Sequence, residues 1–270
     1  MSTAISASLV KELRDLTGAG MMDCKRALEE TGGDLEAARR LLRERGLAAA
    51  GKRAGRETTE GLVRTLVEAS VGSIVGVACE TEPVAKNEEF RAFAEALVRA
   101  VHADGPQAVE RLEQERLELI GRLGENVVVA GAARFAAPPG HVLGAYTHPP
   151  AHKIGVLVEL EGGTPELARL VAMHVAFAAP SWTTREEVPE EVVAAERAIY
   201  LNSEEVRSKP EAARAKIVEG MLGKRFYAAV PGGVLADQAW IHEPAKTVAQ
   251  AVEEGGARLV RFARVAVAGP

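Results

Sequence analysis

The sequence contains few aromatic residues, two cysteines and no long hydrophobic run. Phe, Trp and Tyr make up 4% of the 270 residues, and few lie next to basic residues, which argues against the stacking surfaces that bind single-stranded nucleic acid. Cys24 and Cys79 are too few for a disulfide framework, and we expect two reduced, partly buried thiols. No stretch reaches the roughly 20 apolar residues that span a bilayer, and residues 1–4 lack the features of a signal peptide. These absences predict a cytoplasmic protein without a membrane partner.

The charged residues are balanced and interleaved. The formal net charge is −5, and no basic stripe of the kind that neutralises nucleic-acid phosphates is visible. The glycines lack the Lys-Ser/Thr or strand-loop-helix context of a phosphate-binding loop, and the Gly-x-Ser-x-Gly motif is missing. We therefore expect a protein that binds no nucleic acid directly, uses no cofactor and is not an enzyme.

Apolar residues at helical spacing predict three short helices within residues 1–45. The first ends at Gly18 and Gly20, which permit positive φ, and the second ends at Gly32-Gly33. Asp34 is expected to cap the third helix by accepting a free backbone N–H. Residues 46–60 have no apolar periodicity, which predicts a mobile linker that is helical in part.

The rest of the sequence contains an internal repeat with a period of about 80 residues. Each half begins with two strand-like segments, continues into an amphipathic helix and ends with a third extended segment. This order predicts an α+β fold whose core has two related halves, each an antiparallel sheet covered by helices. The predicted strands are residues 62–69, 74–80 and 127–135, with a turn at 70–73, and then residues 142–148, 154–160 and 259–267, while the helices begin at Glu88 and Thr164.

Helical segments are also inserted into both halves. Residues 107–123 form one, and residues 186–223 predict an antiparallel helical pair that turns near Ser208-Lys209-Pro210. We expect this pair to project as a surface for a partner or for self-association. The predicted organisation is a bundle at 1–45, a linker at 46–60, a first half at 61–140, a second half at 141–180 and 225–270, and a coiled-coil-like hairpin at 181–224.

The histidines offer little chemistry. His141, His148 and His152 lie close in sequence, but they lack the Glu-x-x-His or cysteine companion that is usual in zinc sites, so we predict no metal. His174 lies on an otherwise apolar helix face, where a hydrogen-bonded core residue is the favoured interpretation and an interface role the alternative.

The segment 80–87 places an acid between a strand and a helix. Pro83 is expected to hold Glu82 in an extended conformation and to end the strand pairing, which would present the carboxylate on a stiff loop tip. The alternative is an ordinary strand-to-helix turn.

Several long motifs are similar to those of the elongation factor Ts family. The resemblance begins in the N-terminal segment 7–25 and continues in order through essentially the whole chain. The matching segments after it are Glu80-Thr81, Val84-Ala85-Lys86-Asn87, Gly124-Glu125-Asn126, and residues 152–158, 172–176 and 243–248.

This resemblance implies an N-terminal bundle like ubiquitin-associated domains, a two-part core and a helical hairpin in the second half. It also implies a guanine nucleotide exchange factor that binds elongation factor Tu, GDP-bound or nucleotide-free, displaces magnesium and promotes GDP release. A homodimer or a two-to-two complex stays open. The implied contact residues are Gly20, Met21 and Met22 in the bundle, Thr81, Glu82, Pro83 and Val84 in the magnesium-displacing loop, and Met173 and His174 in the core.

The sequence departs from the family pattern in two places. The family loop is Thr-Asp-Phe-Val, whereas Glu82 and Pro83 stand here at the acid and the aromatic position. The sequence also stops at Ala268-Gly269-Pro270, where some relatives continue into another helix. Two other interpretations of the sequence are a ubiquitin-type or nascent-chain binding module built on the bundle, and an enzyme that uses the three clustered histidines.

Overall fold

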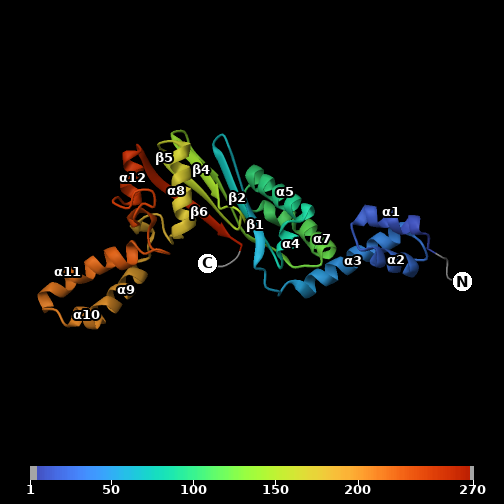
Figure 1. Ribbon diagram of the computed structural model, residues 1–270, viewed down its shortest axis with the longest axis horizontal. Coiled ribbons are helices and arrows are strands. Elements are labelled where there is room, and N and C mark those ends of the chain that lie inside the picture. Colours follow the sequence, from blue (N-terminus) through green and yellow to red (C-terminus); the bar gives the residue numbers. More distant parts are fainter. Residues whose placement is uncertain (1–4, 268–270) are drawn as a thin grey trace.

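The computed structural model describes residues 5–267. Two expectations therefore fall outside the described residues: the lack of signal-peptide features at residues 1–4, and the departure from the family pattern at residues 268–270. The chain begins with three helices, α1 (Ala7–Thr17), α2 (Met21–Glu30) and α3 (Leu35–Arg53), which form a small bundle at one end of an elongated molecule (Figure 1). The Asp34 carboxylate accepts a hydrogen bond from Ala37 N at 2.9 Å, which confirms the predicted cap of α3.

Helix α3 continues beyond the bundle, so residues 46–53 are helical and are packed against the core. Gly46 meets Gly121 on α7 (Glu113–Leu123), where a Cβ built at Gly121 would lie 3.1 Å from Gly46 Cα. Ala50 is buried in the core of the first half, and Arg53 Nη1 donates to Ile120 O at 3.4 Å. The segment predicted to be a mobile linker, residues 46–60, therefore begins with a helix that packs against the core.

Each half of the core is built on a three-stranded antiparallel sheet with the same strand order. The first sheet is β1 (Glu60–Glu68), β2 (Val71–Cys79) and β3 (Val127–Ala136), and the second is β4 (His141–Thr147), β5 (Ile154–Gly162) and β6 (Ala257–Ala266). The pairing of the central strand with the third strand shifts register once in each sheet, at Gly76/Val77 and at Glu159/Leu160. The predicted α+β fold with two related halves is confirmed.

The turn between β1 and β2 differs from the prediction. It consists of Ala69 and Ser70, because Glu68 pairs with Val71, whereas residues 70–73 were expected to form it. Ala69 adopts a left-handed conformation with φ 50°, and this allows a two-residue reversal without glycine at that position. The strand therefore starts at Val71, and the glycine at position 72 lies within it.

The core has four layers (Figure 1). Helices of the first half cover one face of the first sheet, helices of the second half cover one face of the second sheet, and the two uncovered faces pack on each other. The covering helices are α5 (Glu88–Asp104), α6 (Ala108–Arg111) and α7 in the first half, and α8 (Pro165–Ala178) and α12 (Val248–Glu254) in the second. Both central strands are therefore buried on both faces.

Glycines on the facing strands allow the two sheets to approach each other. A Cβ built at Gly72 would lie 2.7 Å from Leu157 Cδ1, and one at Gly155 would lie 2.4 Å from Val63 Cγ1. Glycine within a strand commonly marks such a close approach. The resulting core between the sheets joins the halves into one packed unit.

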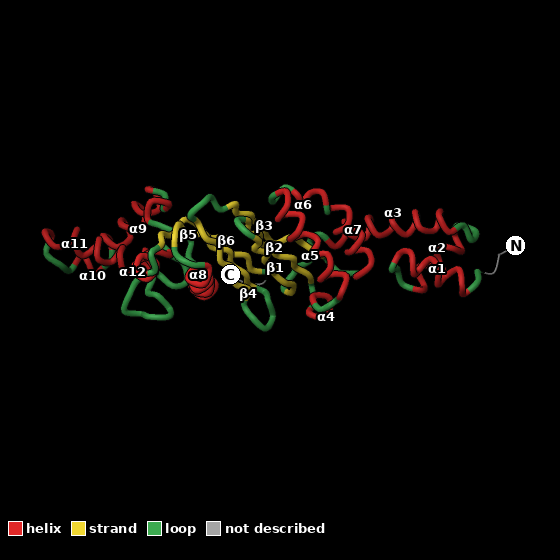
Figure 2. Tube along the Cα trace, turned by 90° about the horizontal axis from the view of Figure 1, so that it is seen from above, coloured by secondary structure: helices red, strands yellow, loops and turns green. Residues whose placement is uncertain are grey.

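The insertion in the second half projects from the end of the molecule opposite the bundle (Figure 2). It contains α9 (Glu190–Asn202), α10 (Glu204–Arg207) and α11 (Glu211–Met221), so the chain turns at residues 208–210 as predicted and a short third helix precedes that turn. The remaining elements are the short helix α4 (Glu82–Ala85), 3-10 turns at Arg185–Glu187 and Leu235–Asp237, and a π-helical segment at Leu222–Tyr227. Among residues 5–267, no helix is both long and apolar enough to cross a membrane.

Candidate functional site

The predicted loop at residues 81–84 forms an exposed tip directly after β2. Thr81, Glu82 and Pro83 are exposed, and Val84 is half-buried against the core of the first half. Glu82 is the first residue of α4, so the prediction that it is extended was wrong, and the extended residue is Thr81, with φ −130° and ψ 153°. Proline is compatible with the first turn of a helix, where its missing N–H leaves no bond unmade.

The Glu82 carboxylate faces Lys86, one helical turn later. Its distance to Lys86 Nζ is 2.7 Å, and both side chains are about two-thirds exposed. The hydrogen bond from Lys86 lowers the pKa of Glu82, so the group is ionised at neutral pH. Because the pair is exposed, it contributes little, and a partner can draw the carboxylate away from Lys86.

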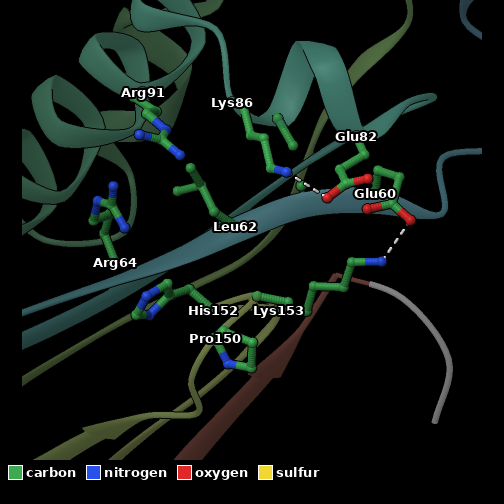
Figure 3. Close-up of a pocket in the computed structure, with 12 residues that line it drawn as sticks. Glu60, Leu62, Arg64, Glu82, Lys86, Arg91, Pro150, His152 and Lys153 are labelled. Atoms are coloured by element: carbon green, nitrogen blue, oxygen red, sulfur yellow. Dashed lines mark hydrogen bonds and ion pairs between the residues drawn. The ribbon is translucent and has the colours of Figure 1, made fainter.

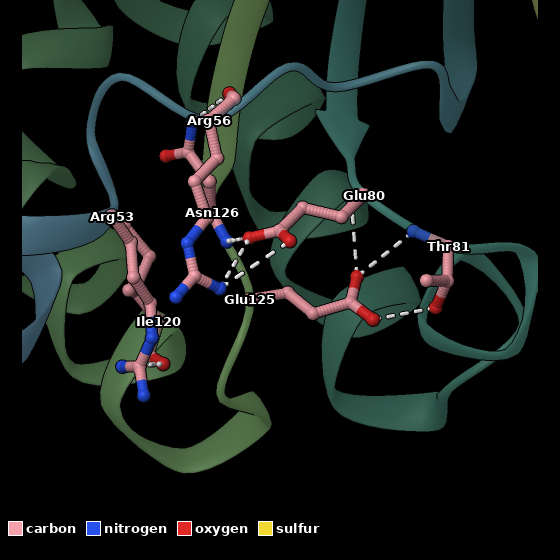
Figure 4. Close-up of polar contacts among 7 residues, drawn as sticks. All are labelled: Arg53, Arg56, Glu80, Thr81, Ile120, Glu125 and Asn126. Atoms are coloured by element: carbon pink, nitrogen blue, oxygen red, sulfur yellow. Dashed lines mark hydrogen bonds and ion pairs between the residues drawn. The ribbon is translucent and has the colours of Figure 1, made fainter.

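A clamp of two carboxylates fixes the base of this tip (Figure 4). Glu125, which follows α7, accepts hydrogen bonds from Glu80 N at 3.1 Å, Thr81 N at 3.0 Å and Thr81 Oγ1 at 2.5 Å. In return, Glu80 Oε1 accepts from Asn126 N at 2.7 Å. The loop that starts the tip and the loop that follows α7 therefore hold each other in place.

Arg56 and Asn126 complete the clamp. Arg56 Nη1 lies 3.4 Å from Glu80 Oε1, and Asn126 Nδ2 donates to Arg56 O at 2.9 Å. Asn126 is buried, so its side chain is held by packing as well. The sequence resemblance included Glu125 and Asn126 in a motif but implied no role for them. Their hydrogen bonds to the base of the tip indicate that they hold it in position.

The second predicted contact region lies at the start of α2. Gly20 is the N-cap residue of α2 without a side-chain cap, and Met21 and Met22 are 50% and 62% exposed. Leu16 at the end of α1 is also exposed, so an apolar surface with two flexible thioether side chains faces outward. Surfaces of this kind commonly mark a protein contact.

A cleft of about 740 Å³ lies between the bundle and α7, beside the contact of α3 with α7, and Gly20 is one of the residues that line it. Arginines from both sides line it, among them Arg39 and Arg40 from α3 and Arg122 from α7. Gly20 and the tip at Glu82 lie in different parts of the molecule, and α3 and α7 connect them (Figure 1). The two predicted contact regions are therefore not brought together into one site.

The third predicted region contains one buried and one half-buried residue. His174 is fully buried, and Met173 beside it on α8 is half-buried. The exposed large apolar residue of this helix is Phe177, which is 70% accessible and which the sequence analysis did not identify. Met173 and Phe177 lie one turn apart on α8, and the His174 side chain is buried beneath the helix surface.

His174 belongs to a closed hydrogen-bond network. Its Nε2 donates to Gln238 Oε1 at 3.0 Å, and its Nδ1 accepts from Ile241 N at 3.3 Å. The Gln238 amide donates in turn to Ala229 O at 2.8 Å, which fixes its orientation. Burial lowers the pKa of His174, a second contribution in that direction comes from nearby His242, and the Gln238 hydrogen bond opposes both.

This network predicts that folding stability falls in mild acid. The unfolded chain binds a proton at His174 below about pH 6.5, while the folded chain resists it because burial disfavours the charged imidazolium and because a proton on Nδ1 would face the Ile241 N–H. The contribution is complete above pH 6.5 and is lost as the pH falls toward the lower folded pKa, with a slope of at most about 1.4 kcal/mol per pH unit. Urea unfolding of the wild type and of His174→Gln across this range measures it, and equal slopes would contradict the prediction.

The remaining histidines and cysteines form no reactive cluster. His141 Nδ1 lies 2.8 Å from Glu159 Oε1, and His148 Nδ1 lies 2.9 Å from Tyr146 Oη. Nowhere in the described part of the chain do three or more His, Cys, Asp or Glu side chains gather in a way that could hold a metal ion. Cys24 and Cys79 are fully rather than partly buried, and burial raises the pKa of Cys79 to about 12, which keeps the thiol protonated.

The amino-acid sequence of this chain is similar to those of known proteins. The family model described as Elongation factor TS matches residues 80–269. The chain is 39% identical to elongation factor Ts of Alkalilimnicola ehrlichii, covering 98% of this chain and 92% of that protein. It is 41% identical to the elongation factors Ts of Thioalkalivibrio sulfidiphilus and Escherichia coli, covering 97% of this chain and 92% and 91% of those proteins. The chain therefore belongs to the elongation factor Ts family of translation elongation factors.

Proposed function

We propose that this chain is a guanine nucleotide exchange factor that binds elongation factor Tu, displaces magnesium and promotes GDP release in the cytoplasm. Such an activity makes and breaks no covalent bond, so it depends on positioned surfaces rather than on catalytic side chains. The observation that carries the proposal is the exposed acidic tip at Thr81, Glu82 and Pro83, held at its base by Glu125.

The separation of the exposed surfaces supports a partner that is held at more than one place. Met21 and Met22 offer an apolar contact on the bundle, and Met173 and Phe177 offer another on α8. The tip lies on the first half of the core, between these two regions along the molecule (Figure 1). By linkage, a factor that binds the nucleotide-free partner more tightly than the GDP-bound one weakens GDP binding by the same ratio.

The tip carries an acid without the aromatic residue that is typical of the family. Glu82 provides the carboxylate for the magnesium water shell on a side chain one CH₂ longer than that of aspartate. Burying a phenylalanine would contribute roughly 1.5–3 kcal/mol of contact, which Pro83 does not match. Proline reduces the ordering cost of docking instead. We propose that exchange persists here through the rest of the interface.

The test is the release of a fluorescent GDP analogue from the cognate elongation factor Tu, followed by stopped flow. We expect strong acceleration that saturates with the concentration of this protein. Binding to elongation factor Tu without acceleration of release would overturn the exchange function, and absence of binding would overturn the partner as well.

The same assay addresses the loop. Glu82→Asp combined with Pro83→Phe is expected to raise the saturating release rate several-fold, because the aromatic side chain adds contact area that Pro83 lacks. The two single substitutions separate the effect of the acid from that of the aromatic. An unchanged rate in the double variant would show that this loop does not limit exchange.

A further inference from the structure

A pocket of about 350 Å³ opens where the first half meets the connection between β4 and β5 (Figure 3). Its walls come from β1, from α4, from the first turn of α5 and from residues 150–153. It lies behind the tip, with Glu82 at its edge. Pockets of this size hold small ligands.

The lining of the pocket is cationic, although the protein as a whole is acidic. It contains four cations, Arg64, Lys86, Arg91 and Lys153, and two carboxylates, Glu60 and Glu82. Each carboxylate faces a lysine: Glu60 Oε1 lies 2.6 Å from Lys153 Nζ, and Glu82 Oε1 lies 2.7 Å from Lys86 Nζ. The positive charge that remains is that of the two arginines.

Arg64 and Arg91 lie at the same end of the pocket, with His152 below them and the Glu60–Lys153 pair at the opposite end (Figure 3). Neither arginine forms an ion pair with any residue between 5 and 267. They come from different elements, Arg64 from β1 and Arg91 from α5, so their proximity is a product of the fold.

The wall that carries His152 is held in a fixed position. His152 has φ 56°, a conformation that non-glycine residues adopt rarely. Its backbone N donates to His148 O at 3.0 Å, and its carbonyl accepts from Val63 N on β1 at 2.7 Å. Lys153 Nζ also donates to Thr59 O at 3.3 Å. Because these bonds are made within the protein, the wall needs little ordering for the pocket to bind a ligand.

We propose that this pocket binds a small phosphate anion. The guanidinium fork matches the oxygens of an oxyanion, and bidentate charge-assisted bonds are among the strong ones. A phosphate monoester carries about −1.5 to −2 at pH 7, which balances two arginines, whereas one carboxylate does not. Because the pocket is concave, it fits a small anion better than it fits a side chain presented by the flat surface of another protein. This site does not depend on the exchange function.

The experiment is calorimetric titration of the full chain with pyrophosphate and with inorganic phosphate, with acetate as the monoanion of a carboxylic acid. We expect saturable binding of pyrophosphate with a Kd below about 1 mM at low salt, and shifts of the Gly61, Lys86 and His152 amide resonances in a ¹H–¹⁵N spectrum. Arg64→Gln and Arg91→Gln are each expected to weaken binding about tenfold.

Arg99→Gln is the matched control, because it removes the same charge from the same helix, α5, where Arg99 pairs with Glu95 outside the pocket. It is expected to leave the affinity within about twofold of the wild type. Absence of saturation up to about 10 mM would overturn the proposal. Equal weakening by Arg99→Gln, or binding of acetate as tight as that of phosphate, would overturn it too.

Discussion

Gly144→Ala is expected to lower the free energy of unfolding by about 3 kcal/mol, at the upper end of the usual range for overpacked cores. A Cβ built at Gly144 on β4 would lie 2.4 Å from Ala168 C and 2.4 Å from Arg169 N. Both atoms belong to the backbone of α8, so no side-chain rotation can relieve the contact, and the helix must move away from the sheet. Chemical denaturation followed by circular dichroism measures the loss.

Gly220→Ala is the control for this substitution. Gly220 lies in α11, and a Cβ built there meets nothing within 4 Å. Alanine is favoured over glycine inside a helix by roughly 0.5–1 kcal/mol, so this variant is expected to be neutral or more stable. If Gly144→Ala were as stable as Gly220→Ala, α8 would not be packed on β4 as described.

Glu125→Ala is expected to reduce the saturating rate of GDP release about tenfold, with a small effect on the affinity for elongation factor Tu. The substitution removes the acceptor of three hydrogen bonds and leaves the backbone N–H groups of Glu80 and Thr81 unpaired. Hydrogen bonds to a charged group contribute about 1.5–3 kcal/mol each, and a loss of 1.4 kcal/mol in the transition state is a factor of ten. Glu125 is thus proposed as a positioning residue for the tip.

The expected division between rate and affinity distinguishes this role from a loss of folding. Glu115→Gln on α7 removes one exposed carboxylate that makes no contact with the tip, and its release kinetics should match those of the wild type. A fall in affinity for elongation factor Tu with an unchanged saturating rate would show that Glu125 supports docking rather than the position of the tip.

The sequence was sufficient to predict the two halves because their signals are local. Each half repeats the order of two strands, a helix and a third strand, and in the bundle the predicted cap Asp34 accepts the expected backbone N–H. Errors arose where a neighbouring segment decides the conformation. Glu82 is helical although it precedes a proline, and Thr81 just before it is extended and hydrogen-bonded to Glu125.

The packing of the two sheets on each other has a local signal in the sequence. Residues 71–79 and 154–160 are apolar almost without alternation, which is typical of strands buried on both faces. Gly72 and Gly155 mark where the partner sheet comes close. Which glycine faces which leucine or valine depends on the relative placement of the sheets, which no local pattern encodes. The same limit applies to Glu125 and Thr81, which lie 44 residues apart in sequence.

Because α3 is an uninterrupted helix, its length fixes the orientation of the bundle relative to the core. Leu42 packs within the bundle, and Gly46 crosses α7, so a few residues of uninterrupted helix join two fixed contacts. An α-helix turns by about 100° and rises 1.5 Å for each residue. One residue more or fewer between Leu42 and Gly46 would rotate Met21 and Met22 by more than a quarter of a turn relative to the tip. The spacing along α3 therefore sets the orientation of one proposed contact surface relative to the other, and an insertion or deletion there would change that orientation.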